Sequence, residues 1–368
     1  MPFQIAIGCN VRKSPFFDAT VADGVKSFSV YNHMFAPSHF GDPEGEYWAL
    51  IKNVVMWDVA CERQVELAGP DAETLMRYLT TRDIGNTAIG QGRYVPICDY
   101  DGILINDPVL QKLRDDCFWL SIADSDILLW AQAIAAERGL DVRVTEPDAS
   151  PLAVQGPRAD DVVADLFGDW VRELKYFWFR ETELDGIPIL LARSGWSKQG
   201  GFELYLRDAS RGNELYGRVK EAGAAYGIAP GAPSDIERVE SGLLSYGADA
   251  RQGINPFEAG LGNFVDLDRE DDFVGKVALK RMAEEGLRRR RVGFVIGGKQ
   301  ISGITEWHDV TLAQDIVGSV TEAVFSPRLG KNIATGMLAT GVGGDEPGLK
   351  ITIDGECRSV TVNALPFC

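Results

Sequence analysis

Two stretches of the chain carry the same succession of apolar and polar positions. One begins at Val65 (VELAGPDAETLMRYL) and the other at Leu152 (LAVQGPRADDVVADL). Each starts with an alternating apolar strand, continues with Gly-Pro, and ends with apolar residues at the i, i+3 and i+4 spacing of an amphipathic helix. Proline suits the first helical position, because an N–H there has no helical partner. The pattern predicts a duplicated strand-to-helix unit and two related α+β layers, with chance similarity of two Gly-Pro turns as the alternative.

The region between and after these stretches contains further elements. Asp101-Gly102 is a favoured pair for a tight hairpin turn, and the segment FWLSIADS that follows is predicted to be a strand. Asp124 or Ser125 can cap a following helix, ILLWAQAIAAER. A capping box that starts at Ser234 predicts a second helix, which runs through IERVESGLLSY.

The pattern changes toward the C-terminus. Short apolar segments separated by Gly-rich turns, such as VGFVIGG and LKITIDG, predict a small all-β domain. A run of arginines, Arg288–Arg291, precedes them, and we interpret it as a solvated linker. The formal net charge of −17 opposes any broad association with phosphate backbones or anionic lipid. We therefore expect no nucleic-acid partner.

Composition narrows the function classes further. No apolar stretch is long enough to cross a membrane, and the N-terminus lacks the apolar core of a signal peptide, so we expect a cytoplasmic protein without a membrane partner. The six cysteines form no CxxC pair and the three histidines have no HExxH spacing, so we expect no metal site. Small molecules are the expected partners, and a homodimer is left open.

One segment carries the sharpest functional signal. Residues 192–206, ARSGWSKQGGFELYL, resemble the part of the T-protein (aminomethyltransferase) family that ends in Gly-(Tyr/Phe)-Glu after a Gly-Tyr-Thr-Gly turn. Further stretches resemble the family in the same order: FAPSHF, WDVACERQVEL, GRYVPICDYDGILINDPV, LAVQGPRA, IERVESGLLSYGAD, NPFEAGL, FVGKVAL and VGSVTEAVFSPRLG. Because they cover nearly the whole length, the resemblance extends beyond one borrowed motif.

The resemblance implies an α+β fold of three domains, arranged like a cloverleaf around a folate-filled channel. Two would be α+β domains with antiparallel sheets: a discontinuous folate-binding domain, residues 1–50 and 145–280, and a ferredoxin-like domain, residues 51–144. A C-terminal β-barrel or jelly-roll-like domain would occupy residues 285–368. Tetrahydrofolate is the cofactor that the family implies.

Glu203 receives the clearest role from the resemblance. On a strand, Phe202, Leu204 and Leu206 would face one way, and Glu203 and Tyr205 the other. The matching family glutamate binds the pterin ring, and a carboxylate here can accept two hydrogen bonds from adjacent N–H groups of that ring. Alternation alone would favour a solvated carboxylate, so the surrounding motif carries this interpretation.

Other residues match positions of the folate site. Tyr94 matches a family tyrosine that lines it, Ser121 lies on the strand FWLSIAD, and Trp196 is placed in the same site. Arg238 matches the arginine of the family's Arg-Leu-Glu-Ala-Gly motif. Its charge suits either the carboxylate of the folate tail or an internal ion pair with Glu240.

Two departures from the family pattern indicate another substrate. The family carries Gly-Gly-x-x-Asp-Asp-x-x-Val, whereas this chain has Asn106 before Asp107, and both are candidate catalytic positions. If the first acid supports a cationic methylene intermediate, Asn106 puts aminomethyl transfer in doubt and leaves Asp107 to position the reactants. Trp196 stands where the family has tyrosine, and its indole offers a larger face to a cation.

Within the family, GWSKQGG, NDPV, IADSD and IERVESGLLSYG resemble the dimethylsulfoniopropionate demethylases. The implied reaction transfers a methyl group from the sulfonium of dimethylsulfoniopropionate to N5 of tetrahydrofolate, giving 5-methyltetrahydrofolate and methylmercaptopropionate. Trp196 and Tyr205 would hold the cation. Lys198 would pair with the propionate carboxylate, unless it is a solvated loop lysine.

Other donors stay open at this point. A glycine-betaine-like ammonium, or the lipoyl-bound aminomethyl group of glycine cleavage, would keep tetrahydrofolate and change the donor. A folate-binding accessory protein for iron–sulfur assembly would share the fold without methyl transfer. Such proteins resemble one another in a Lys-Gly-Cys-Tyr-x-Gly-Gln segment, and the corresponding FVGKVAL here has no cysteine.

Overall fold

The computed structural model describes residues 7–250, 253–304, 306–344 and 346–368. The chain divides into two compact units, each assembled from several segments. Unit 1 comprises the residues up to 73, 87–93 and 109–234, and unit 2 comprises 74–86, 94–108 and 235–368.

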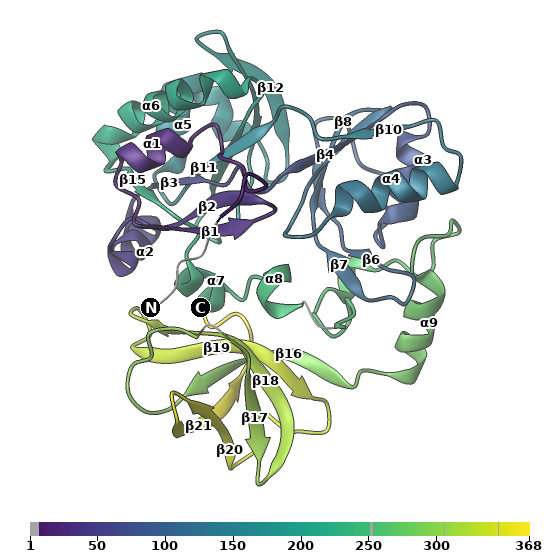
Figure 1. Ribbon diagram of the computed structural model, residues 1–368, viewed down its shortest axis with the longest axis vertical. Helices are drawn as coiled ribbons and strands as arrows, with labels where there is room; N and C mark the ends of the chain where they lie inside the picture. The colour runs from purple at the N-terminus through teal and green to yellow at the C-terminus, as the bar shows by residue number, and fades with distance from the viewer. Residues whose placement is uncertain (1–6, 251–252, 305, 345) are drawn as a thin grey trace. The chain divides into compact units, whose positions relative to one another are not determined.

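Unit 1 contains two larger sheets whose strands come from distant parts of the chain (Figure 1). The first has the order β12 (Phe179–Leu184), β13 (Ile187–Ala192), β14 (Gly201–Leu206), β11 (Ser150–Gln155), β3 (Val55–Asp58) and β15 (Ala229–Gly231). The second has the order β10 (Arg143–Thr145), β4 (Gln64–Ala68), β9 (Cys117–Ser121), β8 (Val109–Arg114) and β5 (Gly92–Tyr94). Pairing in the first sheet is antiparallel, except that β15 runs parallel to β3.

Further elements of unit 1 include a hairpin and five α-helices. They are β1 (Ser27–Tyr31), β2 (Met34–His39), α1 (Phe17–Ala22), α2 (Pro43–Lys52), α4 (Ile127–Glu137), α5 (Ala159–Phe167) and α6 (Gly212–Gly223). The predicted helix after the strand FWLSIADS is therefore present as α4, although its N-cap is Asp126 and not Asp124 or Ser125.

Apolar layers cover both faces of the six-stranded sheet. On one face, α5 and α6 lie side by side, and Val163 of α5 packs in a cluster with Val154 and Leu204 of the sheet (Figure 1). On the other face, Tyr205 packs in a cluster with Trp119 of the five-stranded sheet. The core of unit 1 therefore holds the strand β14 rigidly from both sides.

Both predicted strand-to-helix units form. β11 leads into α5, and β4 leads into α3 (Ala72–Leu79), a helix divided between the two units. The glycines of the two Gly-Pro turns have φ of +145° at Gly69 and +121° at Gly156, and in each a Cβ would lie 2.7 Å from a backbone oxygen. Glycine is required in both copies for the same reason. The prediction that proline occupies the first helical position is wrong, since each helix begins two residues after its proline.

Unit 2 contains a closed barrel, drawn in yellow-green and yellow in Figure 1. Its strands, in order, are β16 (Arg289–Ile296), β19 (Lys331–Ala339), β18 (Asp315–Ser326), β17 (His308–Leu312), β20 (Leu349–Ile353) and β21 (Glu356–Asn363). Phe294, Leu338 and Ile351 are buried in its core. The predicted all-β C-terminal domain is confirmed, and β17 is a strand that the sequence pattern did not reveal.

Other elements of unit 2 include a short hairpin and three α-helices. They are β6 (Ile97–Cys98), β7 (Leu104–Asn106), α7 (Asp235–Ser241), α8 (Tyr246–Asp249) and α9 (Lys276–Glu285). The hairpin predicted around Asp101-Gly102 is confirmed, with φ of +78° at Gly102. Its second strand ends immediately before Asp107.

Two predictions fail in unit 2. Of the run Arg288–Arg291, Arg288 is exposed, as a solvated linker would be, whereas Arg289–Arg291 form the start of β16, where the Arg291 side chain is 9% exposed and pairs with Asp249. The helix predicted from Ser234 is interrupted after α7, because Gly242 adopts a left-handed φ of +65° that cannot continue a helix. The chain therefore turns and forms the separate short helix α8.

The fold class agrees with the α+β expectation, with antiparallel sheets and a C-terminal barrel. The boundaries given for the three domains stay a prediction. Within the described ranges, no helix has both the length and the apolar character needed to span a membrane.

Candidate active site

Glu203 lies in the middle of β14 and is buried. Only 6% of its surface is exposed, so the solvated carboxylate that alternation alone would favour is not what forms. The predicted alternation is confirmed, since Phe202 and Leu204 lie in the helix-side core and Tyr205 in the opposite cluster. Its neighbours in this strand therefore fix the direction of the Glu203 carboxylate.

Two hydroxyl groups donate to the Glu203 carboxylate. Ser194 Oγ and Tyr205 Oη both bond Oε2, the latter at 3.1 Å. Among the described residues, Oε1 has no hydrogen-bond partner and keeps its capacity as an acceptor. Burial raises the pKa of Glu203, and the two hydroxyl donors oppose that rise. Glu203 is therefore a buried carboxylate in which Oε2 accepts two hydrogen bonds and Oε1 can accept one from a ligand.

Tyr205 connects this carboxylate to the five-stranded sheet. Its hydroxyl also interacts with Ser121, whose Oγ accepts a hydrogen bond of 3.0 Å from Gln64 Nε2. Burial, followed by the charge of Glu203, raises the pKa of Tyr205 well above its usual range, so the phenol stays protonated. The structure thus brings together three predicted residues, Ser121, Glu203 and Tyr205, in one polar chain. Tyr205 is itself fully enclosed, and its contact with a cation stays a prediction.

The loop before β14 is anchored by Gln155, a residue that sequence reasoning did not select. Its Nε2 donates to the carbonyl oxygen of Ser194 at 3.0 Å, and its Oε1 accepts from Ser197 Oγ at 2.9 Å. A Cβ at Gly195 would lie 2.1 Å from this amide, and φ there is +149°. The closely spaced glycines of GWSKQGG could have indicated such a residue, because glycine is needed where another group lies close to the backbone.

Trp196 and Lys198 belong to the turn that Gln155 supports. Trp196 is half-buried and Lys198 is exposed. This exposure is compatible with contact to a ligand, but the roles of both residues in donor binding stay predictions. Loops held by rigid strands are the usual place for such groups.

In unit 2, Tyr94 and Asp107 form a hydrogen-bonded pair. Tyr94 Oη donates to Asp107 Oδ2 at 2.7 Å, and the ring of Tyr94 packs edge-on against Phe264 at 5.1 Å between centroids. Asn106 is fully buried, and its Oδ1 accepts the backbone N–H of Asp107 at 3.0 Å. The amide that replaces the family's first acid therefore holds the backbone of Asp107 in place.

Burial raises the pKa of Asp107 to about 7, and the charge of Asp249 adds to the rise. The hydrogen bond from Tyr94 and the charge of Arg291 act in the opposite direction. Burial and the negative charge of Asp107 raise the pKa of Tyr94 well above its usual range. At neutral pH this pair is a carboxyl group near its titration midpoint beside a protonated phenol.

Arg238 occupies a fully buried position on α7. It pairs with Asp249 at 3.1 Å and with Glu322 at 3.5 Å. Glu240, the internal partner considered for Arg238, pairs with Arg328. The internal ion pairs of Arg238 are thus with Asp249 and Glu322. Contact of Arg238 with the folate tail stays a prediction.

The family model of the GCVT N-terminal domain matches residues 16–269, and that of the glycine cleavage T-protein C-terminal barrel domain matches residues 289–368. The chain belongs to the glycine cleavage T-protein family.

Individual T-protein relatives extend this result. The dimethylsulfoniopropionate demethylase DmdA of Ruegeria pomeroyi is 43% identical over 96% of this chain and 96% of that protein. An aminomethyltransferase of Desulfitobacterium hafniense is 30% identical over 89% of this chain and 90% of its own length. The crystal structure of the glycine cleavage system aminomethyltransferase T from Bartonella henselae shares the fold, with a TM-score of 0.85 at 23% identity, covering 97% of this chain and 98% of that one.

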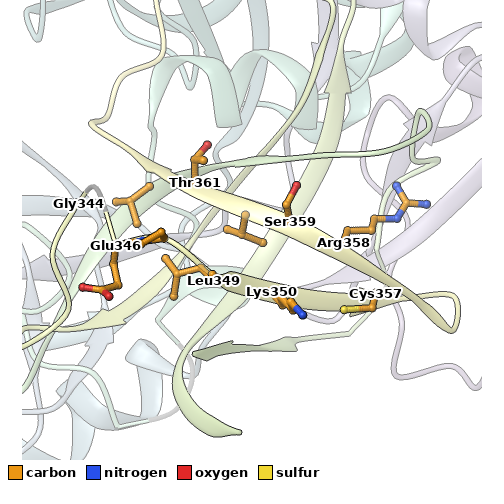
Figure 2. A pocket seen from close by; sticks show the side chains of 12 residues that line it. Gly344, Glu346, Leu349, Lys350, Cys357, Arg358, Ser359 and Thr361 are labelled. Atoms are coloured by element: carbon orange, nitrogen blue, oxygen red, sulfur yellow. The ribbon is translucent and has the colours of Figure 1, made fainter. Parts of the chain in front are cut away.

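In the present chain, a cavity of about 570 Å³ lies on the C-terminal barrel, between β20, β21 and the loop before them (Figure 2). Lys350, Arg358, Ser359 and Thr361 are among its lining residues. Its lining includes none of the residues assigned to folate or to the methyl donor. The Arg358 guanidinium is engaged by the carbonyl oxygen of Lys299 and by Glu356. The residues that line the cavity are thus separate from the candidate site residues named above.

Proposed function

We propose that this T-protein-family chain is a tetrahydrofolate-dependent demethylase of dimethylsulfoniopropionate. The methyl group of the sulfonium would be transferred to N5 of tetrahydrofolate, with loss of the N5 proton, and the C–S bond would break with its electron pair on sulfur. The products are 5-methyltetrahydrofolate and methylmercaptopropionate. A small-molecule methyl donor is the partner that this reaction requires.

One observation carries the choice of donor. The 43% identity to the Ruegeria demethylase extends over 96% of both chains, whereas the aminomethyltransferase of Desulfitobacterium hafniense is 30% identical. The substitution of an amide for an acid at Asn106 supports the same choice, because methyl transfer from a sulfonium forms no methylene cation that a second carboxylate would stabilise.

The residues of unit 1 fit tetrahydrofolate, the cofactor of this family. Glu203 is a buried carboxylate whose Oε1 has no hydrogen-bond partner within the part of the chain that the structure describes. A carboxylate oxygen that receives no donor from these residues can accept hydrogen bonds from a ligand, and a pterin ring carries adjacent N–H groups. Glu203 would hold the pterin, while Ser194 and Tyr205 fix the orientation of its carboxylate. Bound tetrahydrofolate supplies N5 as the nucleophile.

On the donor side, the chain would position the sulfonium and would not protonate the departing sulfur. A sulfonium leaves as a neutral thioether, so a general acid has little to contribute and alignment of the reacting atoms dominates. We assign the cation to the indole face of Trp196, assisted by Tyr205, and the propionate to Lys198. Asp107, held by Tyr94 and by the Asn106 amide, would orient the reactants through its negative charge.

A donor panel tests the proposal. Purified protein is incubated with tetrahydrofolate and either dimethylsulfoniopropionate, glycine betaine or a trimethylsulfonium salt, and 5-methyltetrahydrofolate is quantified by mass spectrometry. We expect turnover with dimethylsulfoniopropionate and stoichiometric methylmercaptopropionate. Asp107→Asn should lose this turnover, whereas Asp101→Asn in the exposed turn of the same hairpin should keep it. Turnover with the betaine alone would replace the sulfonium donor with an ammonium.

A further inference from the structure

Arg291 lies at the centre of a buried charge cluster in unit 2. Its Nη2 and the Nη1 of Arg238 both bond Asp249 Oδ2, at 3.2 Å and 3.1 Å. Thr321 and Thr335 donate to the other oxygen, Asp249 Oδ1, at 2.6 Å and 3.0 Å. Two guanidinium groups therefore share one carboxylate whose remaining acceptor sites are already filled.

A second carboxyl group, that of Glu322, contacts Arg238. Burial and the charge of Asp235 raise the pKa of Glu322, the further acid partner of Arg238, to about 7. Glu322 therefore compensates Arg238 only in part at neutral pH. Arg291 forms its ion pair with Asp249, a carboxylate it shares with Arg238, and its guanidinium also donates to the carbonyl oxygens of Gly242 and Leu243.

The same cluster lies next to the Tyr94–Asp107 pair. Arg291 lies opposite Met337 in the register of β16 and β19, and Met337 packs in one apolar cluster with Leu104 and Tyr94. Leu104 belongs to the strand that ends immediately before Asp107. Arg291 and Tyr94 interact electrostatically, and Arg291 attracts the Asp107 carboxylate while Asp249 repels it. The guanidinium and the carboxylate of this cluster therefore act on Asp107 with opposite sign.

We propose that Arg291 is a positioning residue for the demethylation reaction, which favours the carboxylate form of Asp107 that accepts the hydrogen bond from Tyr94, while Asp249 limits that effect. The inference rests on the proposed function for the part that Asp107 plays in turnover. It extends that function to residues on α8 and on the first strand of the barrel. Nothing in the sequence motif around Asp107 indicated them.

Several charged groups of this cluster act on Asp107. Tyr94, Asp249 and Arg291 act on it directly. Arg238 and Glu322 act through Asp249, and Asp235 acts through Glu322. Removal of the Arg291 charge should therefore raise the pKa of Asp107, and removal of the Asp249 charge should lower it. A purely structural role of the ion pair would not give shifts of opposite sign.

The test measures the titration of Asp107 directly. The full chain is labelled with 13C at the aspartate carboxyl groups, and the Asp107 signal is assigned by its loss in Asp107→Asn. We expect the Asp107 midpoint to rise by roughly half a unit to one unit in Arg291→Gln and to fall by a similar amount in Asp249→Asn. Arg291→Lys, which keeps the charge, should restore the original midpoint. Arg290→Gln, on the neighbouring residue of β16, is the matched control and should leave it unchanged.

The acid limb of the pH profile of kcat/KM provides the second measurement. It should move in the same direction as the NMR midpoint in each variant, and thermal melting identifies any variant that does not fold. If Asp249→Asn is unstable, the Arg291→Gln and Arg291→Lys pair still decides the outcome. Equal midpoints in those two variants would overturn the inference. Absence of demethylation in the unaltered protein would instead overturn the proposed function, since the NMR titration can be measured without turnover.

Discussion

Glu203 illustrates how a single residue acquires a role from its surroundings. A strand glutamate facing away from the helices is ordinarily solvated, but here the second sheet covers that face and Trp119 and Tyr205 fill the space between them. The carboxylate that remains is buried, accepts two hydroxyl groups on one oxygen, and has the other available. Its free acceptor, rather than its charge alone, makes it suitable for a ligand with N–H donors.

The Glu203→Gln variant tests this role at the same scale. The amide replaces one acceptor by a donor that faces the donors of the pterin, so we expect tetrahydrofolate affinity to fall by about 10- to 100-fold. Isothermal titration calorimetry measures the affinity, and the melting temperature should change little. Glu181→Gln, on the exposed end of the pair with Arg207, is the control. Unchanged affinity would remove Glu203 from the site.

Trp196 is the residue at which this chain departs from the family's tyrosine. If its indole holds an onium cation, Trp196→Ala should raise KM for dimethylsulfoniopropionate by roughly 2- to 30-fold, and Trp196→Phe should raise it less because a π face remains. Steady-state kinetics give KM, with folate affinity and melting temperature measured beside it. Parallel losses in all three quantities for both variants would mean that Trp196 packs against the cofactor or the core.

At the scale of elements, the loop 195–200 depends on backbone geometry that only glycine permits. A Cβ at Gly201 would lie 2.2 Å from the carbonyl oxygen of Val154, and φ there is +148°. We therefore expect Gly201→Ala to lower the melting temperature and to abolish folate binding. Gly217→Ala, in α6 with no atom within 4 Å, should instead stabilise the protein by about 0.5–1 kcal/mol. Differential scanning fluorimetry and calorimetry distinguish the two, and equal effects would contradict this account.

Asp58, at the end of β3, tethers the segment before α1 through a hydrogen bond from Ser14. Burial raises its pKa from 3.8 to about 6, so ionisation of the folded state costs stability as pH rises from 4 through 6, by roughly 3 kcal/mol. Asp58→Asn cannot ionise. Its melting temperature relative to the unaltered protein should therefore increase between pH 4 and pH 7. A constant difference across that range would show that Asp58 titrates normally.

Local sequence pattern was sufficient for elements whose cause is local. The alternation of β14, the Gly-Pro turns and the hairpin at Gly102 follow from side-chain spacing and backbone preference, and the structure contains them. The buried part of the charge cluster could not be inferred in this way. Arg291 stands in a run of arginines that usually indicates solvent, and its burial depends on Asp249, a residue on another element. Gln155 was missed for a similar reason, since its partners come from a distant loop.

At the scale of the whole molecule, methyl transfer from a sulfonium and aminomethyl transfer from a lipoyl group predict different folate products. We expect no 5,10-methylenetetrahydrofolate when the protein is given the aminomethyl-lipoyl donor of glycine cleavage, because Asn106 cannot provide the second carboxylate. An authentic aminomethyltransferase assayed in parallel is the positive control. Formation of this product at a comparable rate would reassign the chain to glycine cleavage.

Unit 2 is assembled from segments that are far apart in the sequence, so its parts are synthesised at different times during translation. The β6–β7 hairpin buries Cys98 and Leu104 in a cluster with Ile254 and Phe273, and the backbone N–H of Leu104 bonds the carbonyl oxygen of Ile254 at 2.9 Å. These partners leave the ribosome long after the hairpin does. While unit 1 is being completed, the nascent chain must therefore carry an unsatisfied apolar strand pair, which makes residues 94–108 the natural place for a chaperone to bind during translation.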